Sequence, residues 1–296
     1  MSQSYMALEV TRIRPDQVEG VGMLVYESFR DIAERHNFEP AFPEPALAQF
    51  VVRLLVQTEG YGTYLLSEGG KPVACNFGDE RDEVVGVGPV AVAVDRQGLG
   101  YGRQVMEALL KRAQEARFRS VRLVQTAYNT QSFSLYHNLG FNVTDMLANV
   151  RGRPADSEPA VDNVREYTPA DLDACDELHR DVLGIGRRRD IELMAGFAPP
   201  LVVERDGQIA GYVTRFPGQT TFVMHGAARD EQALRDLLIG MARAAPGELH
   251  MLLPVSYAGT LRWAMGQGFK LVELDSYMVW GEYQPPIGAW VPSPFY

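Results

Sequence analysis

Cysteine is scarce in this chain, with only Cys75 and Cys175 among 296 residues. The two lie in different halves of the sequence, so we expect no disulfide framework and interpret both as reduced thiols of a reducing compartment. Long hydrophobic runs are also missing: the longest nearly uninterrupted apolar stretch, 84–94, falls short of the ~20 residues that span a bilayer. No basic start followed by an apolar run opens the chain, which argues against a signal peptide. We therefore expect a cytoplasmic protein with no membrane partner, and a buried strand at 84–94.

Positive charge is in short supply as well. The chain has 28 Lys and Arg residues against 38 Asp and Glu residues, a formal net charge of −10. Because phosphate backbones bind basic surfaces, no nucleic-acid partner is expected. The acidic balance suits a cationic acceptor such as an amine, although solubility alone also explains it.

Several catalytic and metal signatures are absent. The five histidines show no His-Glu-x-x-His spacing and the cysteines no Cys-x-x-Cys, so we expect no metal site. No Gly-x-Ser-x-Gly elbow occurs, which argues against a serine hydrolase. A Walker loop is excluded because no glycine turn ends in Gly-Lys-Ser/Thr. The dinucleotide pattern fails when counted from Gly98, because Arg103 holds the sixth place.

Hydrophobic spacing predicts alternating helices and strands. In the first half we expect a helix opening at 14–16, further helices at 47–56, 101–116 and 132–139, and strands at 61–67, 73–77, 84–94, 121–126 and 141–150. Glycines at the turn 68–71 join the first two strands as a hairpin.

The second half repeats this order. A helix opens at 168–171, a hairpin follows at 201–214, and Gly268 echoes Gly140, an offset of 128 (268 − 140). We therefore expect an α/β (α+β) fold of two tandem domains, each a mixed, mostly antiparallel sheet flanked by helices. The expected domains are 1–152 and 164–296, joined by a proline-containing linker at 153–163.

A glycine-rich turn separates the strand 84–94 from the helix 101–116. Backbone N–H groups at a helix start are unpaired and carry partial positive charge, so an anion such as a pyrophosphate binds there. Glycines let the main chain approach that anion closely, and Arg103 adds charge nearby. The alternative is a flexible connection without a ligand. The turn consists of Gln97, Gly98, Leu99, Gly100, Tyr101 and Gly102.

A second segment follows the strand 121–126 and contains Asn129, Ser132, Leu135, Tyr136, Gly140 and Phe141. Together with the glycine turn it resembles the GCN5-related N-acetyltransferase (GNAT) family. That family carries a Gln/Arg-x-x-Gly-x-Gly/Ala turn, met by Gln97, Gly100 and Gly102. Its Asn-x-x-Ala-x-x-Leu-Tyr-x-x-x-Gly-Phe-like segment is met here except that Ser132 replaces the alanine. The resemblance covers roughly residues 10–150.

The resemblance implies acetyl-CoA as co-substrate, without a metal. The backbone of Val90, Ala91 and Val92 would pair with the pantetheine arm, and a bulge near 88–89 would splay this strand and open a cleft. The glycine turn, Asn129 and Ser132 would complete the binding site.

The reaction implied is direct attack by a small-molecule primary amine in a ternary complex. A backbone N–H near the bulge at 88–89 would polarise the thioester carbonyl, and Tyr136 would protonate the leaving thiolate. The alternative for Tyr136 is a core tyrosine. No acidic residue lies in the strand 84–94, and Asp79, Glu80, Asp82 and Glu83 precede it, so the general base stays unassigned.

The second half is expected to be a degenerate copy. The ungapped offset places His225–Asp230 opposite the glycine turn and Ala264 opposite Tyr136. It would shape the acceptor pocket or an oligomer interface, as in a homodimer. We interpret the basic run 187–189 as a solvated loop and the tail 283–296 as an extended surface segment. Two rival functions remain: a non-catalytic acyl-CoA-binding or sensing module, and a purely structural interaction protein.

Overall fold

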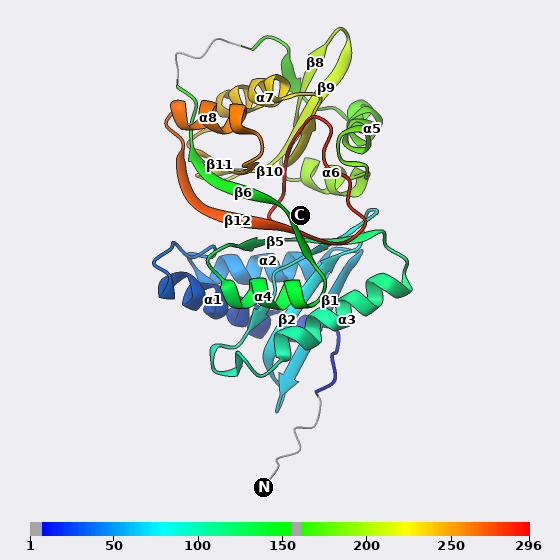
Figure 1. Ribbon diagram of the computed structural model, residues 1–296, viewed down its shortest axis with the longest axis vertical. Coiled ribbons are helices and arrows are strands. Elements are labelled where there is room, and N and C mark those ends of the chain that lie inside the picture. The colour runs from blue at the N-terminus through cyan, green and yellow to red at the C-terminus, as the bar shows by residue number, and fades with distance from the viewer. Residues whose placement is uncertain (1–7, 156–160) are drawn as a thin grey trace. The chain divides into compact units, whose positions relative to one another are not determined.

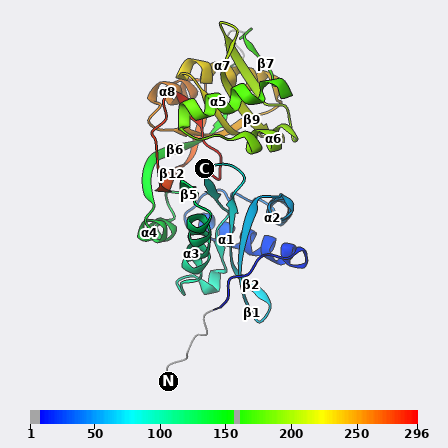
Figure 2. The same cartoon turned by 90° about the vertical axis from the view of Figure 1, so that its right-hand side faces the viewer.

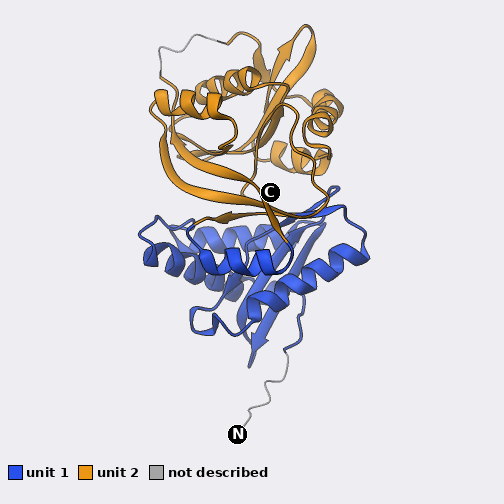
Figure 3. Ribbon diagram, viewed as in Figure 1, with its two compact units in different colours: residues 1–121, 128–140 blue, residues 122–127, 141–296 orange. Residues whose placement is uncertain are grey.

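The computed structural model describes residues 8–155 and 161–296. Part of the expected linker, 156–160, therefore lies outside the described residues. Contacts divide the chain into two compact units, unit 1 with residues 1–121 and 128–140, and unit 2 with residues 122–127 and 141–296 (Figure 3). The expected domain limits stay a prediction, because they follow the sequence repeat whereas the units follow contacts.

Unit 1 has helices packed on a short antiparallel sheet (Figures 1 and 2). Helices α1 and α2 pack against each other, and α3 packs on β1 and β2. Strand β2 pairs with β1, with β3 and with β4. The elements are α1 (Val18–Arg35), α2 (Pro45–Gln57), β1 (Tyr61–Glu68), β2 (Lys71–Asp79), β3 (Val85–Val87), β4 (Ala91–Val92), α3 (Tyr101–Glu115) and α4 (Thr130–Asn138), with short 3-10 turns at Pro15–Gln17 and Val94–Arg96.

The β1–β2 hairpin forms where it was predicted, because Gly69 and Gly70 both take positive φ angles that favour glycine. The single strand expected at 84–94 is wrong. The structure breaks it into β3 and β4 around Gly88 and Pro89, where proline withholds an N–H from the ladder.

Unit 2 contains a longer mixed sheet with strand order β5-β12-β6-β11-β10-β9-β8-β7, and β13 pairs with β10. Gly211 and Tyr212 are neighbours on β9 and therefore point to opposite faces of the sheet. Gly211 faces α7 and Tyr212 faces α5, so these two helices cover opposite faces. The elements are β5 (Ser120–Thr126, whose first two residues belong to unit 1), β6 (Asn142–Gly152), β7 (Val164–Glu166), α5 (Leu172–Leu183), α6 (Arg188–Ala195), β8 (Leu201–Arg205), β9 (Gln208–Phe216), β10 (Thr221–Ala228), α7 (Glu231–Ala244), β11 (Leu249–Pro254), α8 (Ala258–Gly266), β12 (Lys270–Gly281) and β13 (Ala289–Val291), with a 3-10 turn at Pro169–Asp171.

The corresponding strands β6 and β12 of the two sequence halves lie side by side in this sheet. β6 lies beside β11, with Leu249 opposite Gly152 and Pro254 opposite Leu147. β12 lies beside β5, and the Ala127 N–H that follows β5 donates to the Leu274 carbonyl. Strands from both sequence halves are thus interleaved in the sheet of unit 2.

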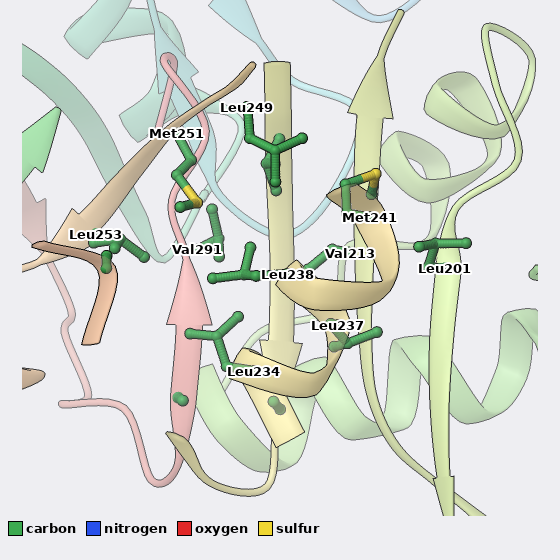
Figure 4. Close-up of a cluster of buried hydrophobic side chains, with 14 of the residues drawn as sticks. Leu201, Val213, Leu234, Leu237, Leu238, Met241, Leu249, Met251, Leu253 and Val291 are labelled. Atoms are coloured by element: carbon green, nitrogen blue, oxygen red, sulfur yellow. The ribbon is translucent and has the colours of Figure 1, made fainter. Parts of the chain in front are cut away.

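The core of unit 2 forms under α7, whose apolar face projects onto β8, β9, β11 and β13 (Figure 4). The buried positions on this face of α7 are Leu234, Leu237, Leu238 and Met241. Each such side chain stabilises the fold by roughly 1.5–3 kcal/mol relative to exposure.

Two expectations for unit 2 are wrong. The basic run 187–189 is not a solvated loop, because α6 starts at Arg188 and Arg187 is 2% exposed. The ion pair of Arg187 with Asp190 makes that burial tolerable. The second part of the tail does not lie on a surface either, since Trp290 and Tyr296 are buried and Ala289–Val291 form β13, whereas none of residues 283–288 is buried.

Candidate active site

Strand β4 carries a one-residue bulge relative to β2. Val87 lies opposite Gly78 and Ala91 opposite Cys75, so four steps along one chain (91 − 87) match three along the other (78 − 75). The bulge expected near 88–89 is thereby confirmed. An extra residue of this kind bends the strand and ends regular pairing.

The outer edge of β4 is set by the alternation of an antiparallel ladder. The N–H of Ala93 donates to the Val73 carbonyl on β2 at 2.9 Å. The N–H and C=O of Val92 therefore point to the opposite edge. The Val92 carbonyl there accepts a hydrogen bond of 2.8 Å from the Ser28 hydroxyl on α1. Among the described strands, β4 pairs with β2 alone.

The glycine turn leads directly into α3. Gly98 and Gly100 have φ angles of 80° and 85°, in the left-handed region that favours glycine. Gly100 is the N-cap residue of α3 and has no side chain to cap the helix, and the first turn contains no acidic residue. The N–H groups of the first turn therefore remain available to an anion.

The side chains around the turn have distinct environments. Gln97 contacts both α1 and β4, since its Oε1 accepts from Arg35 at 3.3 Å and its Nε2 lies 3.5 Å from the Val92 carbonyl. Leu99 is 50% exposed. Tyr101 is buried and its hydroxyl bonds to Glu68, so only its backbone suits the predicted role. Arg103 is exposed and pairs with Glu107 one helical turn on, at 3.4 Å.

Gly102 brings the predicted segments together. A Cβ added to Gly102 would lie 3.4 Å from Val92 on β4 and 3.4 Å from Leu135 on α4. The glycine turn, the bulged strand and α4 therefore converge at the start of α3. Val90, Ala91 and Val92 lie in the bulged segment itself, although only Ala91 and Val92 belong to β4.

Asn129 and Ser132 have a structural role that the sequence analysis did not assign. Asn129 is the N-cap residue of α4, and its side chain accepts the Ser132 N–H at 3.1 Å. The Ser132 hydroxyl in turn donates to the Asn129 carbonyl at 3.0 Å. Capping of this kind stabilises a helix by about 1 kcal/mol.

Tyr136 is buried on α4, one helical turn beyond Ser132. Burial raises the pKa of its phenol well above the ordinary value. The side chain is therefore a neutral proton donor throughout the physiological range.

Three of the four acidic residues before β3 form ion pairs with arginines. Asp79 accepts two hydrogen bonds from Arg81, at 2.8 and 2.6 Å. Glu80 pairs with Arg112 at 3.1 Å, and Glu83 lies 3.8 Å from Arg119. These ion pairs give no reason to assign the general base to Asp79, Glu80 or Glu83.

Sequence reasoning missed Ser28 and Arg35, which α1 places beside β4 and the glycine turn. A signal was present for Ser28. It continues the buried stripe of Val18, Val21 and Val25 at helical spacing, and it is the polar member of that stripe.

The second sequence half differs from the first in the lengths of its connections as well as in its residues. The offset of 128 holds from α4 to α8 (258 − 130) and from β6 to β12 (270 − 142), but it becomes 130 from α3 to α7 (231 − 101) and 136 between the ends of β4 and β10 (228 − 92). The ungapped alignment of His225–Asp230 with the glycine turn is therefore wrong. His225 lies within β10, and the connection 93–100 of unit 1 shrinks to 229–230.

The start of α7 is already capped. The Asp230 side chain accepts the Ala233 N–H at 2.8 Å, and Glu231 follows in the first turn. An acid in this position competes with an external anion for the same donors.

Comparison with known proteins agrees with this geometry. Residues 25–141 match the family model "Acetyltransferase (GNAT) family". No curated protein matches the sequence. A proposed acetyltransferase from Pyrococcus horikoshii has a similar structure, with a TM-score of 0.74 and 17% identity over 97% of this chain and 96% of its own. A GCN5-related N-acetyltransferase from Sphaerobacter thermophilus gives 0.65 and 14% identity over 94% and 96%.

At these identities the structural likeness establishes the fold, which is the mixed, mostly antiparallel α/β fold that the sequence predicted. None of the helices in residues 8–155 and 161–296 is long and apolar enough to cross a membrane. The family match and the two sequence signatures coincide in residues 25–141, which are similar to the acetyltransferase (GNAT) family.

Proposed function

We propose that unit 1 catalyses transfer of an acetyl group from acetyl-CoA to a primary amine, by direct attack in a ternary complex. The observation that carries the proposal is the convergence at Gly102 of a bulged strand edge with an uncapped helix start. The bulged strand edge suits an extended arm that carries amide groups, and the uncapped helix start suits a diphosphate.

In this proposal the diphosphate of the co-substrate accepts N–H groups of the glycine turn, and Arg103 adds positive charge. The pantetheine arm pairs with the backbone of 90–92. The Val92 N–H, which points away from β2, donates to the thioester carbonyl and stabilises the negative charge that develops on its oxygen.

The neutral amine attacks the thioester carbon, and the carbon–sulfur bond breaks as the tetrahedral intermediate collapses. Tyr136 donates its phenolic proton to the sulfur, so CoA leaves as the thiol, and the phenolate then regains a proton from water. The proton released by the amine passes to water in this scheme, since the nearby acids Asp79 and Glu80 are held by arginines. No metal has a role.

A non-catalytic acyl-CoA-binding or sensing module is the second candidate. The ion pairs that occupy the acids before β3 favour it, because a sensor needs no general base. A third candidate, a structural interaction protein, requires no CoA site. The acceptor is proposed to be a small molecule, and cytoplasmic location and homodimer formation also stand as proposals.

Calorimetry with CoA, followed by thiol release from acetyl-CoA across a panel of amines, tests the proposal. Saturable binding together with amine-dependent thiol release supports the enzyme. Binding without release for any amine supports the sensor. Absence of binding at millimolar CoA rejects both.

A further inference from the structure

Strand β10 in unit 2 leaves its neighbour β11 after two residues. The parallel pairing between them covers Thr221 with Leu249 and Phe222 with His250. On its other edge, β10 pairs with β9 through a one-residue bulge, because three steps from Val223 to Gly226 match two steps along β9. Beyond this bulge, residues 226–228 would have an open edge on the β11 side.

The chain fills that edge with its own segment. β13 pairs antiparallel with β10 beyond the bulge, with Gly226 opposite Val291, Ala227 opposite Trp290 and Ala228 opposite Ala289. The N–H of Arg229 donates to Ala210 on the β9 side. By alternation, Gly226 and Ala228 direct their N–H and C=O groups toward β13.

The corresponding position in unit 1 has no such strand. Strand β4 and residues 226–228 of β10 each follow a one-residue bulge and precede a long helix, and of the described strands β4 pairs with β2 alone. One copy therefore keeps an open main-chain edge, and the other holds an extended peptide there.

Side chains fix β13 on both faces. Val291 (Figure 4) and Ala289 join the core under α7, and the Trp290 ring packs edge-on to Tyr277, with 5.0 Å between the ring centroids. Gly288 makes the entry possible. Its φ of +124° favours glycine, and an added Cβ would lie 2.5 Å from the Ala228 carbonyl.

A buried arginine holds the residues after β13. Arg187 donates to the Ser293 hydroxyl at 3.0 Å and to the Tyr296 carbonyl at 3.2 Å, and its guanidinium lies 3.9 Å from the centroid of the Tyr296 ring. Asp190 balances its charge at 2.9 Å. Charge-assisted hydrogen bonds to a buried guanidinium are stronger than neutral ones.

We propose that residues 289–296 are an internal ligand of unit 2. They occupy the β10 edge as an added strand and insert their last residues onto Arg187, so that this edge is closed to any other extended ligand. The recognition is main-chain pairing plus a carbonyl and a hydroxyl on a buried arginine, and the occupant is this chain's own segment. The proposal holds whether or not unit 1 binds CoA.

Hydrogen exchange on the full-length protein tests this assignment. Gly288→Val should release the segment, raising exchange on the order of tenfold or more within 221–228 and 289–296 while the rest of unit 2 stays protected. Gly268→Val is the matched control, because Gly268 has a φ of +91° but open space around its Cβ position. A synthetic peptide of residues 288–296 should restore protection of 221–228 in the Gly288 variant and leave the native protein unchanged.

Ser293→Ala provides a second route if the Gly288 variant does not fold. Ser293 accepts hydrogen bonds from Arg187 and from the N–H groups of Phe295 and Tyr296, so its loss should loosen the same two segments. The proposal is overturned if either folded variant loses protection evenly across unit 2, which would make β13 an ordinary core strand. It is overturned equally if 221–228 stays protected in both, or if the peptide has no effect on a variant with 221–228 exposed.

Discussion

The Ser28 hydroxyl donates a 2.8 Å hydrogen bond to the Val92 carbonyl, and the N–H of the same peptide group, that of Ala93, donates to Val73 at 2.9 Å. The peptide that follows Val92 is thus held from both sides, by α1 and by β2. This fixes the strand edge on which the proposed thioester would lie, directly before the glycine turn.

Removal of this hydroxyl should affect both stability and ligand binding. We expect Ser28→Ala to lower the free energy of unfolding by about 1 kcal/mol, because a partly buried carbonyl loses its donor. We also expect weaker CoA binding by calorimetry. Ser134→Ala is the matched control, since its hydroxyl also donates to a carbonyl, at 2.7 Å, but on an exposed helix face. Equal stability losses in the two variants would contradict the role given to Ser28.

The glycine turn should respond to a Cβ at Gly100. Gly100→Ala places alanine at a φ of 85°, and Gly70→Ala does so at 83°, each with nothing within 4 Å. Both should cost about 1–2 kcal/mol in stability, measured by denaturant unfolding. Only the Gly100 variant should lose CoA affinity, by roughly tenfold or more, because only there does the backbone shape the anion site. A similar loss of CoA affinity in the Gly70 variant would mean that backbone strain alone explains the loss in the Gly100 variant.

Tyr136→Phe should separate chemistry from binding. We expect kcat to fall by a factor of about 10² or more while CoA affinity stays within twofold, since only the proton donor is removed. Because burial raises the pKa of the phenol, activity should show no loss from its ionisation between pH 7 and 9. Tyr64→Phe, which removes a part-buried hydroxyl bonded to Glu80, serves as the control. An unchanged kcat in the Tyr136 variant would eliminate it as the acid.

Acid should destabilise unit 2 through His179. Burial lowers the pKa of this histidine from 6.5 to about 3, and Arg187 adds to the shift. Its Nδ1 lies 2.9 Å from the Ile185 carbonyl, which suits a neutral donor. Between pH 6.5 and 3 the unfolded state binds the extra proton, so stability is lost as pH falls through 6.5.

His179→Gln should flatten this dependence. The loss in free energy of unfolding from pH 7 to pH 5 should shrink by up to about 1.4 kcal/mol per pH unit below 6.5. His137→Gln, at an exposed position, should leave the slope unchanged. The same slope in the native protein and the His179 variant would rule out this histidine as the source.

Local chemistry made much of unit 1 predictable. Gly69 and Gly70 predicted the first hairpin, and the apolar spacing of Val105 and Leu109 predicted α3. The elements of the site were also readable, because the glycine turn and the segment from Asn129 to Tyr136 are contiguous in sequence. Their meeting at Gly102 depends on packing between distant segments, and spacing alone does not reveal it.

The sequence by itself determined the α/β class, the repeated order of elements and the residues of the glycine turn, because periodicity and glycine chemistry act over a few neighbouring residues. Only the tertiary structure decided that β6 and β12 pair with each other, that the repeat is gapped before α7, and that β13 enters the sheet beside β10. These outcomes depend on which strand edges and buried charges come into contact from positions more than a hundred residues apart in the sequence. The contacts of Arg187 with Ser293 and Tyr296 are an example. Local sequence patterns do not predict these pairings, because the burial of the whole core determines them.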